Sequence, residues 1–188
     1  MKSHPKKFVC MITGASGVGK STLAEQLKLK YRNKENIAIL GFDTIGVPSI
    51  EEMTKRYGSP SEWQRAAIKE WVEKILHEIA EPLVILEGQV NFDFICEAFE
   101  YYKFKEFKVI LIDCNEEEMV RRLEHDRGQP ELANDSMRKW RVYLRRQAEE
   151  RHAPVIHTDR ISAEAVLTKL EEILGAELNL KIYLHADV

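Results

Sequence analysis

A glycine-rich octapeptide near the start of the chain constrains the fold more than any other feature of the sequence. Segment 14–21 reads Gly-Ala-Ser-Gly-Val-Gly-Lys-Ser and fits the pattern G-x-x-x-x-G-K-[ST] at every fixed position. It follows the apolar run 8–12, which is typical of a buried parallel strand. Apolar residues then recur at helical spacing as far as Tyr31, which predicts a helix over 21–31. A strand that enters a helix through such a loop predicts an α/β fold.

The same loop has the chemistry of a phosphate site. Its glycines allow successive backbone N–H groups to turn inward around phosphate oxygens, and the helix N-terminus adds its dipole. In this pattern the lysine, here Lys20, contacts the terminal phosphates, and the hydroxyl of Ser21 binds Mg²⁺. We therefore predict a nucleoside triphosphate site with Mg²⁺, built from these contiguous residues: Gly14, Ala15, Ser16, Gly17, Val18, Gly19, Lys20, Ser21 and Thr22.

Composition narrows the class of protein. The 188 residues are 44% hydrophobic and 31% charged, which is typical of one globular domain spanning 1–188. A formal charge of −3 gives no overall attraction to nucleic acid or to an anionic membrane. No apolar stretch precedes the first strand and none approaches the length of a membrane span, so we expect a cytoplasmic location. The cysteines have neither metal-ligand nor redox spacing, which favours reduced thiols: Cys10, Cys96 and Cys114.

Strand and helix patterns alternate along most of the chain. Short apolar runs predict four further strands, at 37–40, 83–86, 109–113 and 155–158. Helical patterns are predicted at 61–79 with Ser61 as N-cap, at 92–101, after Asn115, at 136–151 after Asn134, and from Ser162 to Gly175. This order predicts a three-layer fold with a five-stranded parallel sheet flanked by helices. Alternation over 178–184 predicts an extra edge strand, within the chain or paired with another subunit.

Acidic residues follow three of the predicted strands. Ligands on a parallel sheet bind beyond the carboxyl ends of its strands, so these acids are candidates for the site. Asp43 is placed to orient an acceptor or to hold a metal-bound water, although a role in the turn is the alternative. Glu87 is placed for the water shell of the metal, or for hydrogen bonds to a neighbouring loop. We expect Asp113 to be structural.

Arginines surround a predicted loop at 127–135. Arg127, at its start, is the candidate for contacting the transferred phosphate, because guanidinium groups on a mobile lid suit phosphate oxygens. On the next helix, Arg138, Arg141 and Arg145 share one face and form either a second phosphate surface or a solvated charged face. A nucleic-acid platform with Trp140 fits less well than helix packing.

With these residues identified, segment 8–175 resembles the small P-loop kinases, the superfamily of adenylate, shikimate and gluconate kinases. The resemblance rests on 14–21, on Phe42-Asp43, and on 127–132, which is similar to the arginine-bearing lid of those enzymes. Segment 86–89, Leu-Glu-Gly-Gln, is similar to the zeta-toxin and polynucleotide-kinase relatives. The resemblance to the kinase superfamily implies a three-layer P-loop NTPase, Mg-ATP as donor, an acceptor region at about 43–80 and a lid at about 121–138.

The sequence thus predicts a kinase that transfers the γ-phosphoryl group of ATP to a small-molecule hydroxyl or phosphate acceptor. The predicted catalytic residues are Lys20, Asp43 and Arg127, and the predicted metal ligands are Ser21 and Glu87. Two alternatives remain open: an NTP-binding regulatory switch and a nucleic-acid end kinase. The expected state is a monomer or a homodimer without a membrane partner.

Overall fold

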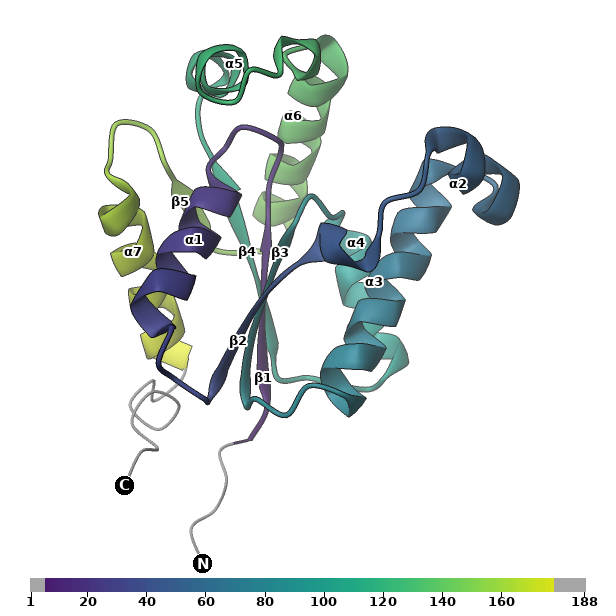
Figure 1. Cartoon of the computed structure of the whole chain (residues 1–188), viewed down its shortest axis with the longest axis vertical. Coiled ribbons are helices and arrows are strands. Elements are labelled where there is room, and N and C mark those ends of the chain that lie inside the picture. Colours follow the sequence, from purple (N-terminus) through teal and green to yellow (C-terminus); the bar gives the residue numbers. More distant parts are fainter. Residues whose placement is uncertain (1–5, 178–188) are drawn as a thin grey trace, which may run out of the picture.

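The five strands form one parallel sheet in the order β2-β3-β1-β4-β5 (Figure 1). The computed structural model describes residues 6–177, so the predicted strand at 178–184 lies outside the described residues. The strands are β1 Phe8–Thr13, β2 Ile37–Gly41, β3 Leu83–Gly88, β4 Phe107–Asp113 and β5 Val155–His157. The five-stranded parallel sheet predicted from the sequence is confirmed.

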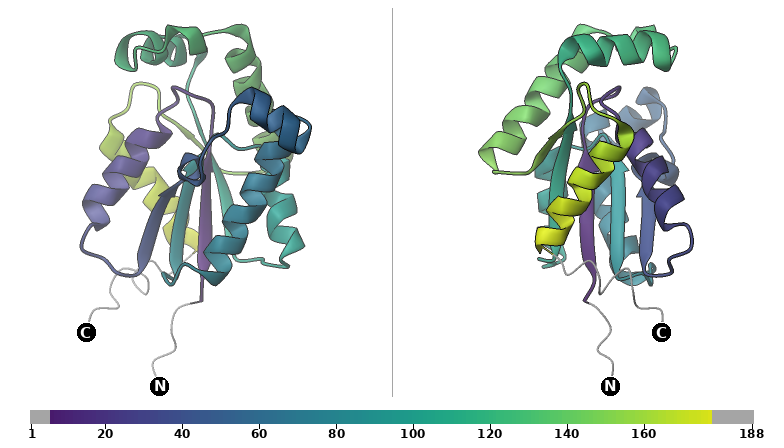
Figure 2. Two further views of the ribbon diagram at one scale, coloured as in Figure 1. Left: turned by 45° about the vertical axis from the view of Figure 1, so that its right-hand side comes forward. Right: turned by 90° about the vertical axis from the view of Figure 1, so that its left-hand side faces the viewer.

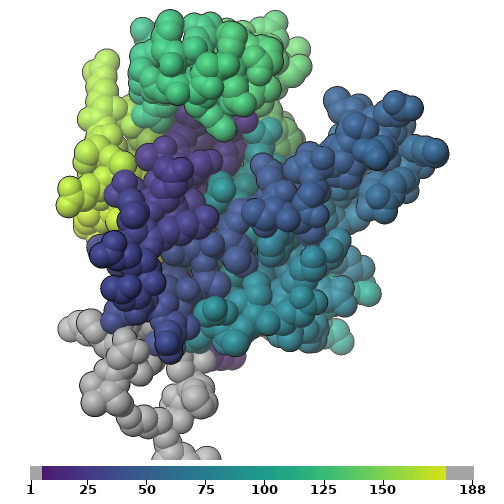
Figure 3. All heavy atoms as spheres, in the orientation of Figure 1, coloured from purple at the N-terminus to yellow at the C-terminus, as the bar shows by residue number. Residues whose placement is uncertain are grey.

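Helices cover both faces of the sheet and complete three layers (Figures 1 and 2). Three short helical turns lie in the connections between the main elements. They are the 3-10 turns η1 Phe42–Ile45 and η3 Pro130–Leu132, and the π-helical turn η2 Arg122–Asp126. Figure 3 shows the surface hollowed between the α5–α6 segment and α2. The helices are α1 Lys20–Tyr31, α2 Ile50–Tyr57, α3 Pro60–His77, α4 Phe92–Tyr101, α5 Glu116–Arg121, α6 Asp135–Glu150 and α7 Ala163–Glu177.

The central strand β1 separates two hydrophobic clusters. Its six residues are all buried, and successive side chains point to opposite faces. Val9 and Met11 pack with α3, α4 and α6, whereas Cys10 and Ile12 pack with α1 and α7. A strand that is buried on both faces reads as a continuous apolar run rather than an alternating one, as its sequence does. The core therefore holds β1 and the loop after it in a fixed position.

Helix caps agree with the sequence at most ends and differ at α3. Asn115 and Asn134 accept hydrogen bonds from the N–H groups of Glu118 and Met137, as predicted. The N-cap of α3 is Ser59 and not Ser61, because Pro60 has the backbone angle that suits a first helical position.

Asp113 anchors α6 to the carboxyl end of β4. Its side chain is 1% exposed and accepts hydrogen bonds from Arg141 at 3.3 Å and from Nε of Arg145 at 2.7 Å. Arg141 also donates to the carbonyl of Cys114 at 2.6 Å. A buried carboxylate with two guanidinium partners has a structural role, in agreement with the expectation for Asp113.

We predict that Asp113→Ala destabilises the fold by about 3 kcal/mol, because it leaves the Arg141 guanidinium buried without its counter-charge. Urea unfolding of the free protein measures the change. Glu150→Ala, which removes an exposed ion pair with Arg146, is the matched control and should cost less than about 0.5 kcal/mol. Equal losses in the two variants would contradict the anchoring role.

Candidate active site

The glycine loop lies at the carboxyl end of β1 and packs tightly against its neighbours. A Cβ atom at Gly14 would lie 2.4 Å from the carbonyl oxygen of Ile112, and one at Gly17 would lie 2.9 Å from Leu123. Gly19, the N-cap of α1, has a left-handed backbone with φ of 104° and makes no side-chain cap. The first N–H groups of α1 therefore have no side-chain acceptor at this cap, which suits an anion.

Lys20 occupies the interior of this loop. The residue is 8% exposed, and its ammonium group donates a hydrogen bond to the carbonyl of Ala15 at 2.8 Å. Burial lowers the pKa of Lys20 to about 8, although the nearby carboxylate of Glu87 opposes the shift. An anion in the loop would stabilise the ammonium form of Lys20.

Four predicted site residues from distant parts of the sequence come together here. Glu87, Arg127 and Asp43 are all close enough to Lys20 to affect its pKa. Burial raises the pKa of Glu87, and Asp43 adds to the rise, whereas Lys20 opposes it. Within the described residues, Arg127 forms no ion pair, so its charge is available to a ligand.

One close backbone contact brings two of these acids together. A Cβ atom at Gly88 would lie 2.3 Å from Cβ of Phe42, so the absence of a side chain lets η1 approach the end of β3. Trp71 of α3 holds the same turn by donating its indole N–H to the carbonyl of Phe42 at 2.9 Å. As a result, Asp43 and Glu87 interact electrostatically.

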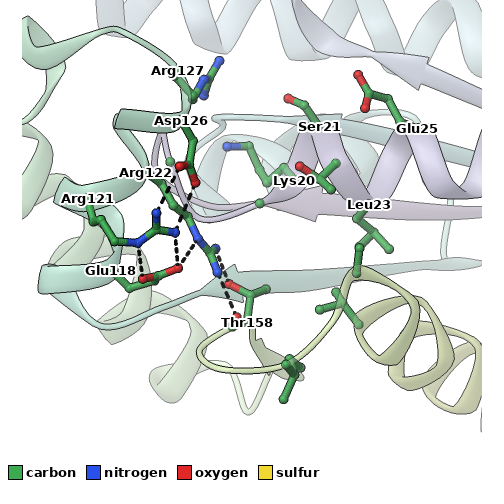
Figure 4. A pocket seen from close by; sticks show the side chains of 16 residues that line it. Lys20, Ser21, Leu23, Glu25, Glu118, Arg121, Arg122, Asp126, Arg127 and Thr158 are labelled. Carbon is green, nitrogen blue, oxygen red and sulfur yellow. Dashed lines mark hydrogen bonds and ion pairs between the residues drawn. The ribbon is translucent and has the colours of Figure 1, made fainter. Parts of the chain in front are cut away.

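A cavity of about 540 Å³ opens beside the loop (Figure 4). Lys20, Ser21 and Arg127 lie at one end of it, and Thr158 lies at the other. Its lining residues come from the glycine loop with α1, from α5–η2, and from the segment after β5: Gly17, Gly19, Lys20, Ser21, Thr22, Leu23, Glu25, Glu118, Arg121, Arg122, Asp126, Arg127, Thr158, Ile161, Ala163 and Val166.

Arg122 forms a fixed wall of this cavity. It donates to the hydroxyl of Thr158 at 2.8 Å and to the carbonyl of Thr158 at 2.9 Å. Its Nε donates to Glu118 at 2.7 Å. The wall formed by Thr158, Ile161, Ala163 and Val166 was not predicted, although Thr158 ends the fifth predicted strand and thus lies at the carboxyl edge of the sheet.

The arginine face of α6 does not belong to the site. Arg141 and Arg145 bind Asp113, and Arg138 pairs with Glu116 at 2.9 Å. Their guanidinium groups are therefore satisfied by carboxylates of this chain. The interpretation of this face as a second phosphate surface is wrong.

The donor set fits Mg²⁺ held mainly by nucleotide phosphates. Ser21 supplies a hydroxyl and Glu87 a carboxylate, the oxygen ligands that Mg²⁺ prefers. In residues 6–177, no three acidic, histidine or cysteine side chains are grouped to bind a metal by themselves. In the same part of the chain, no helix has both the length and the apolar character needed to cross a bilayer.

The profile of a family described as an AAA domain (AAA_18) matches residues 10–142. The chain belongs to this AAA domain family. The matched segment of the AAA domain includes the glycine loop, the turn with Asp43, the strand end with Glu87, and Arg127 at the end of η2.

Solved kinase structures share the fold of this AAA domain. Shikimate kinase from Acinetobacter baumannii, in complex with shikimate, is 16% identical with a TM-score of 0.60, over 92% of this chain and 96% of that chain. A gluconokinase from Sinorhizobium meliloti 1021 is 16% identical with a TM-score of 0.60, over 94% and 99%. Deoxyadenosine kinase from M. mycoides is 12% identical with a TM-score of 0.59, over 90% and 100%. No curated protein matches the sequence. The resemblance to small P-loop kinases is confirmed at the level of fold.

We predict that nucleotide affinity falls by about tenfold between pH 7 and pH 9. The free protein loses the Lys20 proton above a pKa of about 8, whereas bound phosphates hold the ammonium form, so binding takes up a proton in this range. Calorimetric titration with a non-hydrolysable ATP analogue, in buffers of different ionisation enthalpy, measures both quantities. Lys20→Met should bind more weakly and should take up no proton between these pH values. Equal affinity of the unmodified protein at both would contradict the prediction.

Proposed function

We propose that this protein is a kinase that transfers the γ-phosphoryl group of ATP to a hydroxyl or phosphate of a small molecule. The observation that carries the proposal is the electrostatic cluster of Lys20, Asp43, Glu87 and Arg127 at one edge of the sheet. Two cations and two acids beside a phosphate loop match what phosphoryl transfer requires, which is positioning and charge stabilisation.

Each member of the cluster has a role in this proposal. Lys20 and the loop N–H groups hold the donor phosphates, and Arg127 offsets the charge that develops on the transferred group. Mg²⁺, when bound by Ser21 and Glu87, would supply Lewis-acid stabilisation of that charge. Asp43 orients a hydroxyl acceptor and takes its proton while the new P–O bond forms, the bond to the β-phosphate oxygen breaks, and ADP leaves.

The two substrates approach from opposite sides of the loop. The cavity between α1, η2 and the segment after β5 takes the base and ribose. Its wall includes the apolar side chains of Leu23, Ile161 and Val166. The acceptor enters on the other side, where the region 43–80 provides η1, α2 and α3. A lid at 121–138 would close over both. Neither alternative function gains support from a specific observation, and the paired arginines of α6 weigh against a nucleic-acid end kinase.

We predict that Lys20→Ala lowers the rate of transfer by about 1000-fold or more, because the variant loses on the order of 4 kcal/mol of transition-state stabilisation. The assay measures ADP production from Mg-ATP, with and without a pooled metabolite extract. Circular dichroism should show an unchanged fold. Near-normal transfer by the variant would refute the loop assignment. Slow hydrolysis that no extract stimulates would favour a regulatory switch.

We predict that Asp43→Asn lowers transfer by about 100-fold or more while the affinity for ATP changes less than twofold, because the amide cannot take the proton of the acceptor. The same assay gives the rate, and calorimetry gives the affinity. Glu150→Gln, which changes an exposed acid at the end of α6 and outside the lid, is the control. Parallel losses of transfer and of ATP binding would show that Asp43 does not act on the acceptor.

A further inference from the structure

Two buried side-chain amides meet where β3, α4 and α6 join. Asn91 is 7% exposed, and its Oδ1 accepts the backbone N–H of Asp93 at 2.8 Å. Gln147 is 4% exposed, and its Oε1 accepts the backbone N–H of Phe92 at 3.2 Å. Because a backbone N–H can only donate, these contacts fix which end of each amide is oxygen.

Both amide nitrogens lie within hydrogen-bonding distance of one hydroxyl. Nδ2 of Asn91 lies 3.2 Å from Oη of Tyr143, and Nε2 of Gln147 lies 3.1 Å from it. The two hydrogens of Gln147 Nε2 have closer acceptors in Oδ2 of Asp93 at 2.8 Å and Oδ1 of Asn91 at 2.9 Å. Amide nitrogens cannot accept, so none of these contacts uses the hydrogen of the phenol. Among the described residues none accepts the Tyr143 hydrogen, so this hydroxyl remains a donor. Tyr143 is also 40% exposed, whereas both amides are buried.

A chain of hydrogen bonds connects this hydroxyl to the phosphate loop. Gln64 of α3 donates to the carbonyl of Gln89 at 2.9 Å and accepts the N–H of Asn91 at 3.0 Å. The Gln89 side chain in turn accepts a hydrogen bond from Ser16 of the loop at 2.9 Å. None of these residues lines the cavity beside the loop. Because Gln64 belongs to α3, the network joins the loop to the region 43–80, which is proposed to bind the acceptor.

Charges around this network favour an uncharged ligand. The neighbouring arginines already have carboxylate partners: Arg145 binds Asp113, Arg151 binds Asp93, and Arg65 binds Glu97. At the nearby strand ends, Lys20 and Arg127 bind the donor phosphates in the proposed reaction, so the acids Asp43 and Glu87 would repel a second anion. An anionic acceptor would instead need a cation beside Tyr143. Lys139, which is exposed one turn earlier on α6, is the candidate for that role.

We propose that Tyr143 donates a hydrogen bond to an oxygen of the acceptor, and that this acceptor is an uncharged polyhydroxylated small molecule. One of its hydroxyls faces Asp43, and another oxygen accepts the Tyr143 hydrogen. This inference rests on the proposed kinase function, because it assigns the second substrate of that reaction. Tyr143 is a binding and specificity residue, and it takes no part in the proton transfer.

The charge class is tested by passing a pooled metabolite extract through anion and cation exchangers in turn. The unretained fraction should stimulate Lys20-dependent ADP production from Mg-ATP. If only the anion-retained fraction does so, and Lys139→Ala abolishes the stimulation, the uncharged class is overturned while the kinase function stands. If neither the whole extract nor any fraction stimulates ADP production, the proposed function falls and this inference falls with it.

The role of Tyr143 is tested with two variants that act on the same hydrogen. Tyr143→Phe removes it and should raise the KM for the stimulating fraction about tenfold, with the KM for ATP within twofold. Asn91→Asp keeps the tyrosine and a good N-cap, but its carboxylate should accept the Tyr143 hydrogen and produce the same rise. The double variant should be no worse than either single one, since both remove one interaction.

Tyr101→Phe, at an exposed tyrosine of α4, is the matched control and should leave both KM values unchanged. An unchanged acceptor KM in Tyr143→Phe would overturn the role of the hydroxyl. Additive losses in the double variant would show that Asn91 and Tyr143 act separately, which would overturn the argument from the shared hydrogen.

Discussion

Hydrogen bonding of β1 on both of its edges is the constraint on which the site depends. The register pairs Thr13, the last residue of β1, with Gly88 of β3 and with Leu111 of β4. Because all the strands are parallel, their carboxyl ends meet at one edge of the sheet. The glycine loop therefore emerges between the strand ends that carry Glu87 and Asp113. Glu87 lies at the site beside Lys20, whereas Asp113 is bound by the arginines of α6.

The charged side chains at this edge of the sheet form two different groups. Asp113 and its arginines are mutually satisfied and buried, so they fix the position of a helix. Lys20, Glu87, Asp43 and Arg127 have opposite charges in proximity, but none of these four side chains pairs with another within the described residues. Charges that lie close together without pairing are available to a ligand, which distinguishes a site from a structural anchor.

Sequence patterns predicted the sheet, the loop and most helix ends because these depend on local signals. Asn115 and Asn134 cap their helices through contacts three residues away, and such contacts are visible in the sequence. The pairing of Arg141 with Asp113 joins residues 28 positions apart, and no local pattern indicates it. The same holds for Gln64, whose two contacts with the 89–91 turn depend on how α3 packs. Helix α2, Ile50–Tyr57, was not predicted as a separate element, although Ser49 and Glu52 form a capping box at its start.

The contact between Gly88 and Phe42 has a consequence for how η1 and the end of β3 are spaced. The turn that carries Asp43 rests directly on the strand that carries Glu87, with no side chain at Gly88 between them. The spacing of these two backbone segments is therefore set by the absence of a side chain at Gly88. Any side chain at position 88 would act as a spacer and move the turn outward. The backbone positions from which Asp43 and Glu87 extend are thus fixed by direct packing of Phe42 on Gly88, and only the two acidic side chains themselves can rotate.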